Sequence, residues 1–143
     1  MVLKLSHLGA ALLLAWAVGA SAADIEPARC VAVLKLHSND LAEQVKDGNA
    51  ARRPELLQTL RQGAAFIGSA YLHDDLGDED SAKDRLAAAE DEVRQLDAPQ
   101  ARALRTRCST QADTLMQQAP GWQRKVVDHF AQARMKKLLQ PPH

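Results

Sequence analysis

Apolar residues recur at helical spacing in five segments of this chain, and short polar links separate these segments. They span about 27–46, 54–73, 81–96, 100–119 and 122–139. Several links contain proline or glycine, which interrupt helices. No stretch alternates apolar and polar residues as a half-buried strand would. The pattern predicts an all-α fold, a single-domain bundle of about five helices.

The segment 54–73 is apolar around most of the circumference of a helix. Its main stripe consists of Leu57, Leu60, Ala64, Ile67 and Tyr71. Its continuous polar strip is narrow and consists of Glu55, Gln58, Gln62 and Ser69. A helix that is apolar on most of its surface has neighbours on most sides. We therefore expect the other helices to pack around this one.

The remaining segments read as amphipathic helices, each with one apolar stripe facing the core. In the first segment the stripe is Cys30, Val33 or Leu34, His37, Leu41 and Val45. In the third it is Ala82, Leu86, Ala89, Val93 and Leu96. In the fourth it is Ala101, Leu104, Cys108, Ala112, Leu115 and Ala119. In the fifth it is Trp122, Val126, Phe130, Ala133 and Leu138.

Residues 1–23 read as an export signal that is removed, which leaves a helical domain over 24–143. Lys4 supplies a positive start, an apolar run covers 8–18, and Ala20-Ser21-Ala22 is a small-x-small cleavage site. The run is shorter than the roughly 20 apolar residues that span a bilayer, so we expect no stable membrane span after cleavage. A lipoprotein signal requires a cysteine directly after a box of small residues. The first cysteine, Cys30, follows Pro-Ala-Arg instead, which excludes a lipid anchor at Cys30. The protein is expected to be periplasmic or secreted.

Composition narrows the choice of partners. The chain has 18 basic and 18 acidic residues, so no overall charge draws it to nucleic acid or to a membrane.

Aromatic residues make up only 3% of the chain, whereas hydrophobic residues make up 46%. The core must therefore be aliphatic and rich in alanine, which favours close-packed helices over strands.

Cys30 and Cys108 are the two cysteines of the chain. An even number of cysteines behind an export signal indicates a disulfide, and both residues lie on inward stripes. The bond would join residues 108 − 30 = 78 positions apart, for which the chain-entropy model gives about 4–5 kcal/mol of stabilisation. Two unpaired, buried thiols are the alternative.

The acidic run from 74 to 80 resembles a calcium-binding loop only superficially. With Gly77 at the sixth position of an EF-hand, the first ligand would be Leu72 and the twelfth would be Lys83. Neither side chain binds calcium. The run is better explained as a solvated loop in which Asp78 or Asp80 caps the next helix.

His37, His73 and His129 lie on three different expected helices, and facing helices can build a metal site inside a bundle. No two of them share a helix at a spacing of three or four, and the sequence contains no Glu-x-x-His. We therefore assign no metal and no cofactor. A small ligand- or metal-binding bundle remains the alternative function.

Motifs that carry known catalytic chemistry are missing from the sequence. There is no Cys-x-x-Cys, no haem-attachment motif, no Gly-x-Ser-x-Gly and no glycine-rich phosphate loop. We therefore expect a protein that is not an enzyme.

The last segment carries a candidate interaction surface. Its cations, set against the single acid Asp128, are Arg124, Lys125, Arg134, Lys136 and Lys137. Together with Trp122 and Phe130 they could bind anionic lipid, peptidoglycan or an acidic partner. The alternative is an ordinary amphipathic helix whose cations lie at its favourable C-terminal end. The acidic run of residues 74–80 lies in a different part of the chain, so the protein has a basic and an acidic region. Such a charge distribution could support self-association, and a homodimer is therefore a further alternative.

An export signal, a helical body and one disulfide together resemble the general plan of small periplasmic helical proteins, of which type VI secretion amidase-immunity proteins are one group. The resemblance covers this plan only. We expect an exported, non-catalytic protein that binds another protein or an envelope component. Its role would be that of an immunity protein, an inhibitor or an envelope accessory.

Overall fold

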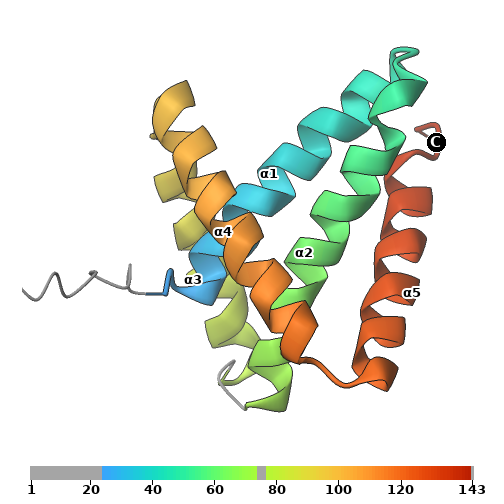
Figure 1. Ribbon diagram of the computed structural model, residues 1–143. Coiled ribbons are helices and arrows are strands. Elements are labelled where there is room, and N and C mark those ends of the chain that lie inside the picture. Colours follow the sequence, from blue (N-terminus) through green and yellow to red (C-terminus); the bar gives the residue numbers. More distant parts are fainter. Residues whose placement is uncertain (1–23, 74–76, 143) are drawn as a thin grey trace, which may run out of the picture.

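The computed structural model describes residues 24–73 and 77–142. The predicted export signal and residues 74–76 of the acidic run lie outside them. The helices are α1 (Pro27–Lys46), α2 (Arg53–Leu72), α3 (Glu79–Arg94), α4 (Ala98–Gln118) and α5 (Gly121–Leu138), with a short 3₁₀ helix η1 (Ala50–Arg52) before α2. Every regular element among the described residues is helical, which confirms the predicted all-α bundle (Figure 1).

Local sequence signals place the helix ends. The side chain of Asp78 accepts a hydrogen bond of 2.8 Å from the backbone N–H of Ser81, so Asp78 caps α3 as predicted. Asp97 caps α4 and forms a reciprocal capping box with Gln100. Pro27 begins α1, where its missing N–H costs nothing.

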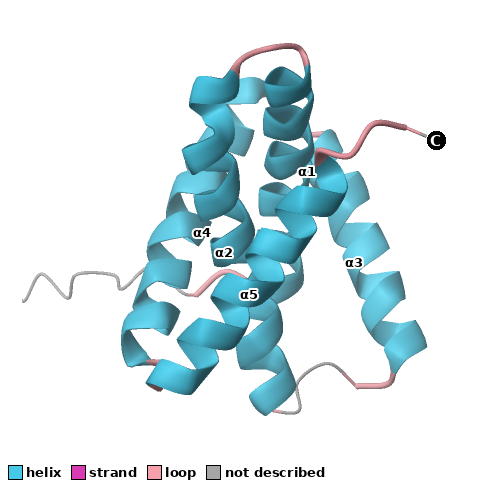
Figure 2. Cartoon of the chain, turned by 90° about the vertical axis from the view of Figure 1, so that its right-hand side faces the viewer, coloured by secondary structure: helices cyan, strands magenta, loops and turns pink. Residues whose placement is uncertain are grey.

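The centre of the bundle is the pair α1 and α2. Helix α1 packs against α2, α3 and α4, and α2 packs against α1, α4 and α5. Helix α4 lies on one side of this pair and α3 on the other (Figure 2). Helix α2 therefore shares with α1 the central place that we predicted for it alone.

Two clusters of buried side chains form the core. The larger one joins α1, α2, α3 and α4 and includes Leu34, Phe66, Val93 and Leu104. The smaller one, around Leu41 and Leu56, lies where the C-terminal part of α5 approaches α1 and α2. Both clusters consist almost entirely of aliphatic side chains, as the low aromatic content requires.

Cys30 of α1 and Cys108 of α4 form the predicted disulfide. Their Cα atoms are 5.3 Å apart, and both side chains are fully buried in the larger cluster. The backbone just before α1 is also tied to α4. There the side chain of Gln111 accepts a hydrogen bond from the N–H of Ile25 and donates one to its carbonyl. The start of the described chain is thus fixed against α4 at two points.

The predicted stripes of α1, α3 and α4 are confirmed. At least two predicted residues of each helix are buried, among them Cys30 and Leu41 on α1, Ala89 and Val93 on α3, and Leu104 and Ala112 on α4. The other predicted positions on α3 and α4 are at least partly covered.

The predicted stripe of α2 is wrong in its C-terminal half, because Ile67 and Tyr71 are exposed. The helix has two contact faces. Phe66 and Ala70 turn into the bundle, whereas Gly68 faces Gln123 and Val127 of α5. The predicted stripe runs between these two faces.

The expected polar strip of α2 is likewise partly buried. Gln62 packs toward α4, where its amide donates to Asp113 at 3.3 Å and accepts from Ser109 at 3.1 Å. Its polar groups are satisfied there, so burial costs little.

The predicted stripe of α5 is also wrong, because Trp122, Val126, Phe130 and Ala133 are exposed. The buried residues of this helix are Val127 and Ala131, one position further along, which corresponds to a rotation of about 100°. In this orientation Asp128 of α5 forms an ion pair with Arg61 of α2. The small side chains of Val127 and Ala131 face the bundle, whereas the aromatic side chains stay exposed.

Candidate interaction surface

Six large hydrophobic side chains are exposed on α2 and α5. They are Ile67 (43% exposed), Tyr71 (77%), Leu72 (50%), Trp122 (60%), Val126 (59%) and Phe130 (54%). They come from the last two turns of α2 and the first three turns of α5, which meet at Gly68. We call these six residues the α2–α5 surface.

The α2–α5 surface contains most of the aromatic side chains that the structure describes. Among the described residues only Phe66 is a buried aromatic, whereas Tyr71, Trp122 and Phe130 are exposed. A chain with so few aromatic residues would be expected to use them in its core. Their position on one surface is therefore unusual for a monomer that binds nothing.

A groove adjoins this surface, with α1 and α2 as its floor and with α3 and α5 as its walls. One part, of about 250 Å³, is lined by Leu34, Gly63 and Phe130, among others. The other part, of about 540 Å³, is lined by Phe66, Ala70 and Ala82, among others. The two parts share Val31, Ile67 and Leu86.

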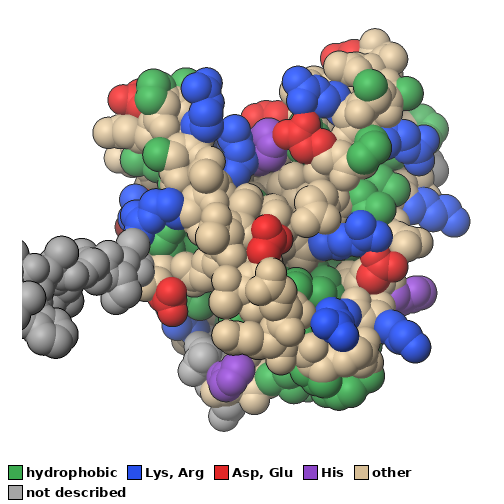
Figure 3. All heavy atoms as spheres, viewed as in Figure 1, with side chains coloured by type: hydrophobic (Ala, Val, Ile, Leu, Met, Phe, Trp, Pro, Cys, Tyr) green, Lys and Arg blue, Asp and Glu red, His purple; other side chains and the backbone are tan. Residues whose placement is uncertain are grey.

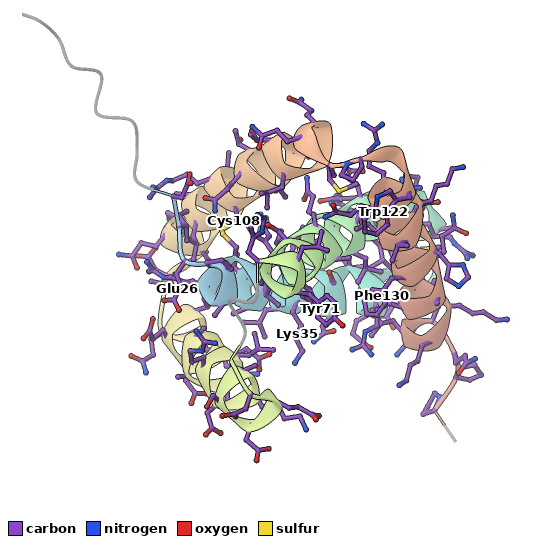
Figure 4. All side chains as sticks on the ribbon, turned by 90° about the horizontal axis from the view of Figure 1, so that it is seen from below. Glu26, Lys35, Tyr71, Cys108, Trp122 and Phe130 are labelled. Carbon is purple, nitrogen blue, oxygen red and sulfur yellow. A yellow bond between two sulfur atoms is a disulfide. The ribbon has the colours of Figure 1, made fainter. Side chains whose placement is uncertain are left out.

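Figure 4, a view from below along the bundle, shows Lys35, Tyr71 and Phe130 between α3 and α5, with α4 on the opposite side of the α1–α2 pair. The two helices that form the walls differ in charge when each is taken as a whole, although the charged residues of α3 that line the groove are Glu79, Lys83 and Arg85. Helix α5 carries five cations against the single acid Asp128, a formal charge of +4 with His129 neutral. Helix α3 carries six acids against three cations, a formal charge of −3.

None of the five α5 cations has a carboxylate partner within the described residues, because Asp128 pairs with Arg61 of α2. Lysine and arginine side chains accordingly gather over α5 at the right of the space-filling view, above a group of hydrophobic side chains at the lower end (Figure 3).

The predicted interaction residues do not form one cluster. Arg134 lines the groove four residues beyond Phe130, and Lys137 shares that face of the helix. Arg124, Lys125 and Lys136 lie about 120–140° around α5 from Phe130. The structure adds Ile67, Tyr71 and Val126, which sequence reasoning had placed in the core because apolar periodicity alone does not distinguish a core face from a binding face.

The three histidines occupy separate places. The Nε2 atom of His37 lies 3.3 Å from a carboxylate oxygen of Glu55, and the Nδ1 atom of His73 lies 2.7 Å from the carbonyl oxygen of Ser69. His129 is exposed on α5. Across residues 24–73 and 77–142, no three His, Cys, Asp or Glu side chains are arranged to hold a metal ion.

The environment of His37 sets its charge. Burial and the nearby Arg105 lower its pKa below 6.5, and the carboxylate of Glu55 opposes them without prevailing. The ring is therefore neutral at pH 7, and Nε2 donates to Glu55. For Glu55, burial alone would raise the pKa, but hydrogen bonds from Arg52 and His37 outweigh burial and lower it below 4.5. This arrangement joins η1, α2 and α1, and we assign it a structural role.

No helix in the described part of the chain is long and apolar enough to cross a membrane. Comparisons with protein-family models, with curated proteins and with solved structures give no match. Over the residues that the structure describes, fold and site define the class: a disulfide-linked bundle of five α-helices with exposed aromatic side chains beside an apolar groove.

Proposed function

We propose that this chain is an exported, non-catalytic protein that binds another protein or an envelope component through the α2–α5 surface and the adjoining groove. In this proposal residues 1–23 are the removed export signal and the helical domain acts in the periplasm or outside the cell. The role is that of an immunity protein, an inhibitor or an envelope accessory.

One observation carries the proposal. On both α2 and α5, the hydrophobic periodicity predicts buried side chains at positions where the structure leaves them exposed. Of these exposed residues, Ile67 of α2 and Phe130 of α5 line one groove. An uncovered apolar area of this kind marks an interaction site in a soluble protein.

The chemistry of the surface agrees with macromolecular binding. Tryptophan, tyrosine and arginine are the residue types that contribute most to binding energy at protein interfaces. Trp122 and Tyr71 supply the aromatic groups, and Arg134 provides a cation at the edge of the groove.

A specific observation also favours the alternative, a bundle that binds a small ligand. The larger part of the groove has a volume of about 540 Å³ and a mainly apolar lining, within the range of small-molecule sites. Native mass spectrometry of the purified protein would show a bound small molecule in that case.

Site-specific photo-crosslinking in the native host tests the main proposal. A benzophenone amino acid is placed at Val126, on the α2–α5 surface, and in a separate variant at Thr106, which is exposed on α4. We expect a discrete cross-linked species from position 126 and none from position 106. Cross-linking that is absent at both positions, or equal at both, would show that this surface binds no macromolecule.

A further inference from the structure

A second hollow lies on the α4 side of the molecule, away from the groove. The N-terminal half of α4 leans away from the α1–α2 pair (Figure 1). The space-filling view shows the hollow that this leaves at the upper edge of the molecule, with lysine and arginine side chains on both sides of it (Figure 3). Helix α3 lies on the other side of the α1–α2 pair, so this hollow is separate from the α2–α5 surface.

Chain direction determines which residues of α1 and α4 lie opposite each other there. Cys30 of α1 is bonded to Cys108 of α4, whereas Ile25, just before α1, is hydrogen-bonded to Gln111 of α4. The two helices therefore run antiparallel. Residues of α1 beyond Cys30 lie opposite residues of α4 that precede Cys108.

Two arginines of α4 face the hollow. On this helix Cys108 points to α1, and Ser109 points to α2, where it donates a hydrogen bond to Gln62. Arg105 lies one turn before both of them and Arg102 lies one turn further, so both arginines continue the same side of α4. Neither guanidinium has an ion-pair partner within the described residues.

His37 lies on the opposite side of the hollow, two turns beyond Cys30 on α1. It is close enough to Arg105 for the two groups to affect each other, because burial and the charge of Arg105 together lower the pKa of His37. The Nε2 atom of His37 is 3.3 Å from Glu55, which lies two turns before Gln62 on the same face of α2. The three helices thus place His37, Glu55 and Arg105 around one hollow.

Positive charge exceeds negative charge around the hollow. Its acids are Glu55 and Asp40, both of which act on His37, and its cations are Arg52, Arg102 and Arg105. Glu55 already accepts hydrogen bonds from Arg52 at 2.6 Å and from His37, so its charge is compensated. The two guanidinium groups of α4 remain without an anion.

We propose that this hollow binds a small oxyanion through the guanidinium groups of Arg105 and Arg102 and the imidazole of His37. A guanidinium group offers parallel N–H donors that match two oxygens of a carboxylate, phosphate or sulfate group. The site is independent of the proposed function, because none of its residues belongs to the α2–α5 surface or lines the groove.

Binding is coupled to the proton on His37. The ring is neutral at pH 7 because the nearby Arg105 and burial oppose a second positive charge, against the opposing effect of Glu55 and Asp40. A bound anion compensates Arg105 and favours the protonated ring. By linkage, affinity for the anion therefore rises as pH falls through the pKa of His37.

Proton NMR of the histidine rings, recorded during a titration with sodium sulfate, tests the proposal. Sulfate is the probe because its own charge does not change between pH 5 and pH 8. We expect the His37 ring signal, assigned with His37→Gln, to move saturably toward the protonated position at pH 6.5. Sodium chloride at equal ionic strength should not reproduce this movement. The exposed His73 and His129 are internal controls and should respond alike to both salts.

Substitutions locate the anion. Arg105→Gln and, separately, Arg102→Gln should each raise the half-saturating sulfate concentration about tenfold, because each removes a charge-assisted pair of donors. Arg124→Gln, the same change at an exposed position on α5, should leave it unchanged. Circular dichroism should show that all three variants keep their helices.

A parallel titration with sodium acetate distinguishes the two sources of such an anion. A saturable response to sulfate alone assigns the site to phosphate-like groups, and a response to acetate assigns it to carboxylates as well. Responses to both anions that equal the response to chloride would overturn the proposal. A response to sulfate that Arg105→Gln and Arg102→Gln leave intact would also overturn it.

Discussion

Gly48 ends α1 in a conformation that other residues rarely adopt. Its φ angle is +107°, in the region where an L side chain meets its own backbone. Gly63, by contrast, lies inside α2, where an added Cβ would meet only the Cβ of Leu34 at 4.0 Å, an ordinary contact. Identical substitutions at the two glycines should therefore act in opposite directions.

We expect Gly48→Ala to lower the free energy of unfolding by about 1–2 kcal/mol through backbone strain. Gly63→Ala should raise it by about 0.5–1 kcal/mol, because alanine is the better helix former. Urea unfolding at neutral pH measures both changes. A loss of stability in both variants would show that Gly63 is required for close packing of α2.

His37 makes the stability depend on pH. Its folded-state pKa lies below 6.5, so on acidification the unfolded chain takes up a proton first. The stability contributed by the neutral ring is complete above pH 6.5 and is lost as pH falls from there through the folded-state pKa. Glu55 acts in the same direction at lower pH, below 4.5.

We expect the free energy of unfolding to fall between about pH 7 and pH 5, and His37→Gln to flatten that fall because glutamine does not titrate. Urea titrations at several pH values provide the measurement. Asp78→Asn is a useful comparison, since Asp78 titrates below 3.8 and should leave this pH range unchanged. A fall of equal steepness in the His37 variant would contradict the assignment.

At the scale of helices, the sequence predicted the inward faces of α1, α3 and α4 but not those of α2 and α5. In the successful cases no large apolar residue of the helix is exposed, so periodicity and burial coincide. On α5 the strongest apolar pattern belongs to the exposed residues Trp122, Val126 and Phe130, whereas the covered face is made by Val127 and Ala131. Periodicity reports where apolar residues gather and does not report what covers them.

Two adjacent valines test the rotation of α5. Val127 is 3% exposed and Val126 is 59% exposed, although the two residues are chemically identical. We expect Val127→Ala to cost about 2 kcal/mol of stability through lost burial, and Val126→Ala to change stability by less than about 0.5 kcal/mol. The unfolding midpoint in urea, at a concentration where the protein is monomeric, compares them. A larger loss from Val126→Ala would mean that α5 packs as the sequence pattern suggested.

For the whole molecule, composition and periodicity were enough to predict an all-α bundle with one disulfide. They were not enough to predict the groove, because a groove arises where α3 and α5 leave part of the α1–α2 pair uncovered. Which helices become neighbours depends on how well their surfaces fit in three dimensions. The ion pair between Arg61 and Asp128, whose partners are 67 residues apart, is a contact of this kind. The candidate surface therefore shares Trp122 and Phe130 with the predicted one and adds Val126 of α5 and three residues of α2.

The disulfide links two helices that are far apart in the sequence. It joins α1 to α4 across 78 residues, a segment that includes α2 and α3. Replacing Cys30 and Cys108 together by alanine should lower the free energy of unfolding by about 2–5 kcal/mol, chiefly because the unfolded chain regains the freedom that the closed loop removes. Chemical unfolding of the two proteins, each with and without a thiol reductant, measures the loss.

The reductant should destabilise the original protein and leave the double variant unchanged, which separates the effect of the bond from that of the smaller side chains. Equal stability of the original protein in oxidising and reducing buffer, with reduction verified by mass, would show that packing alone holds α1 against α4.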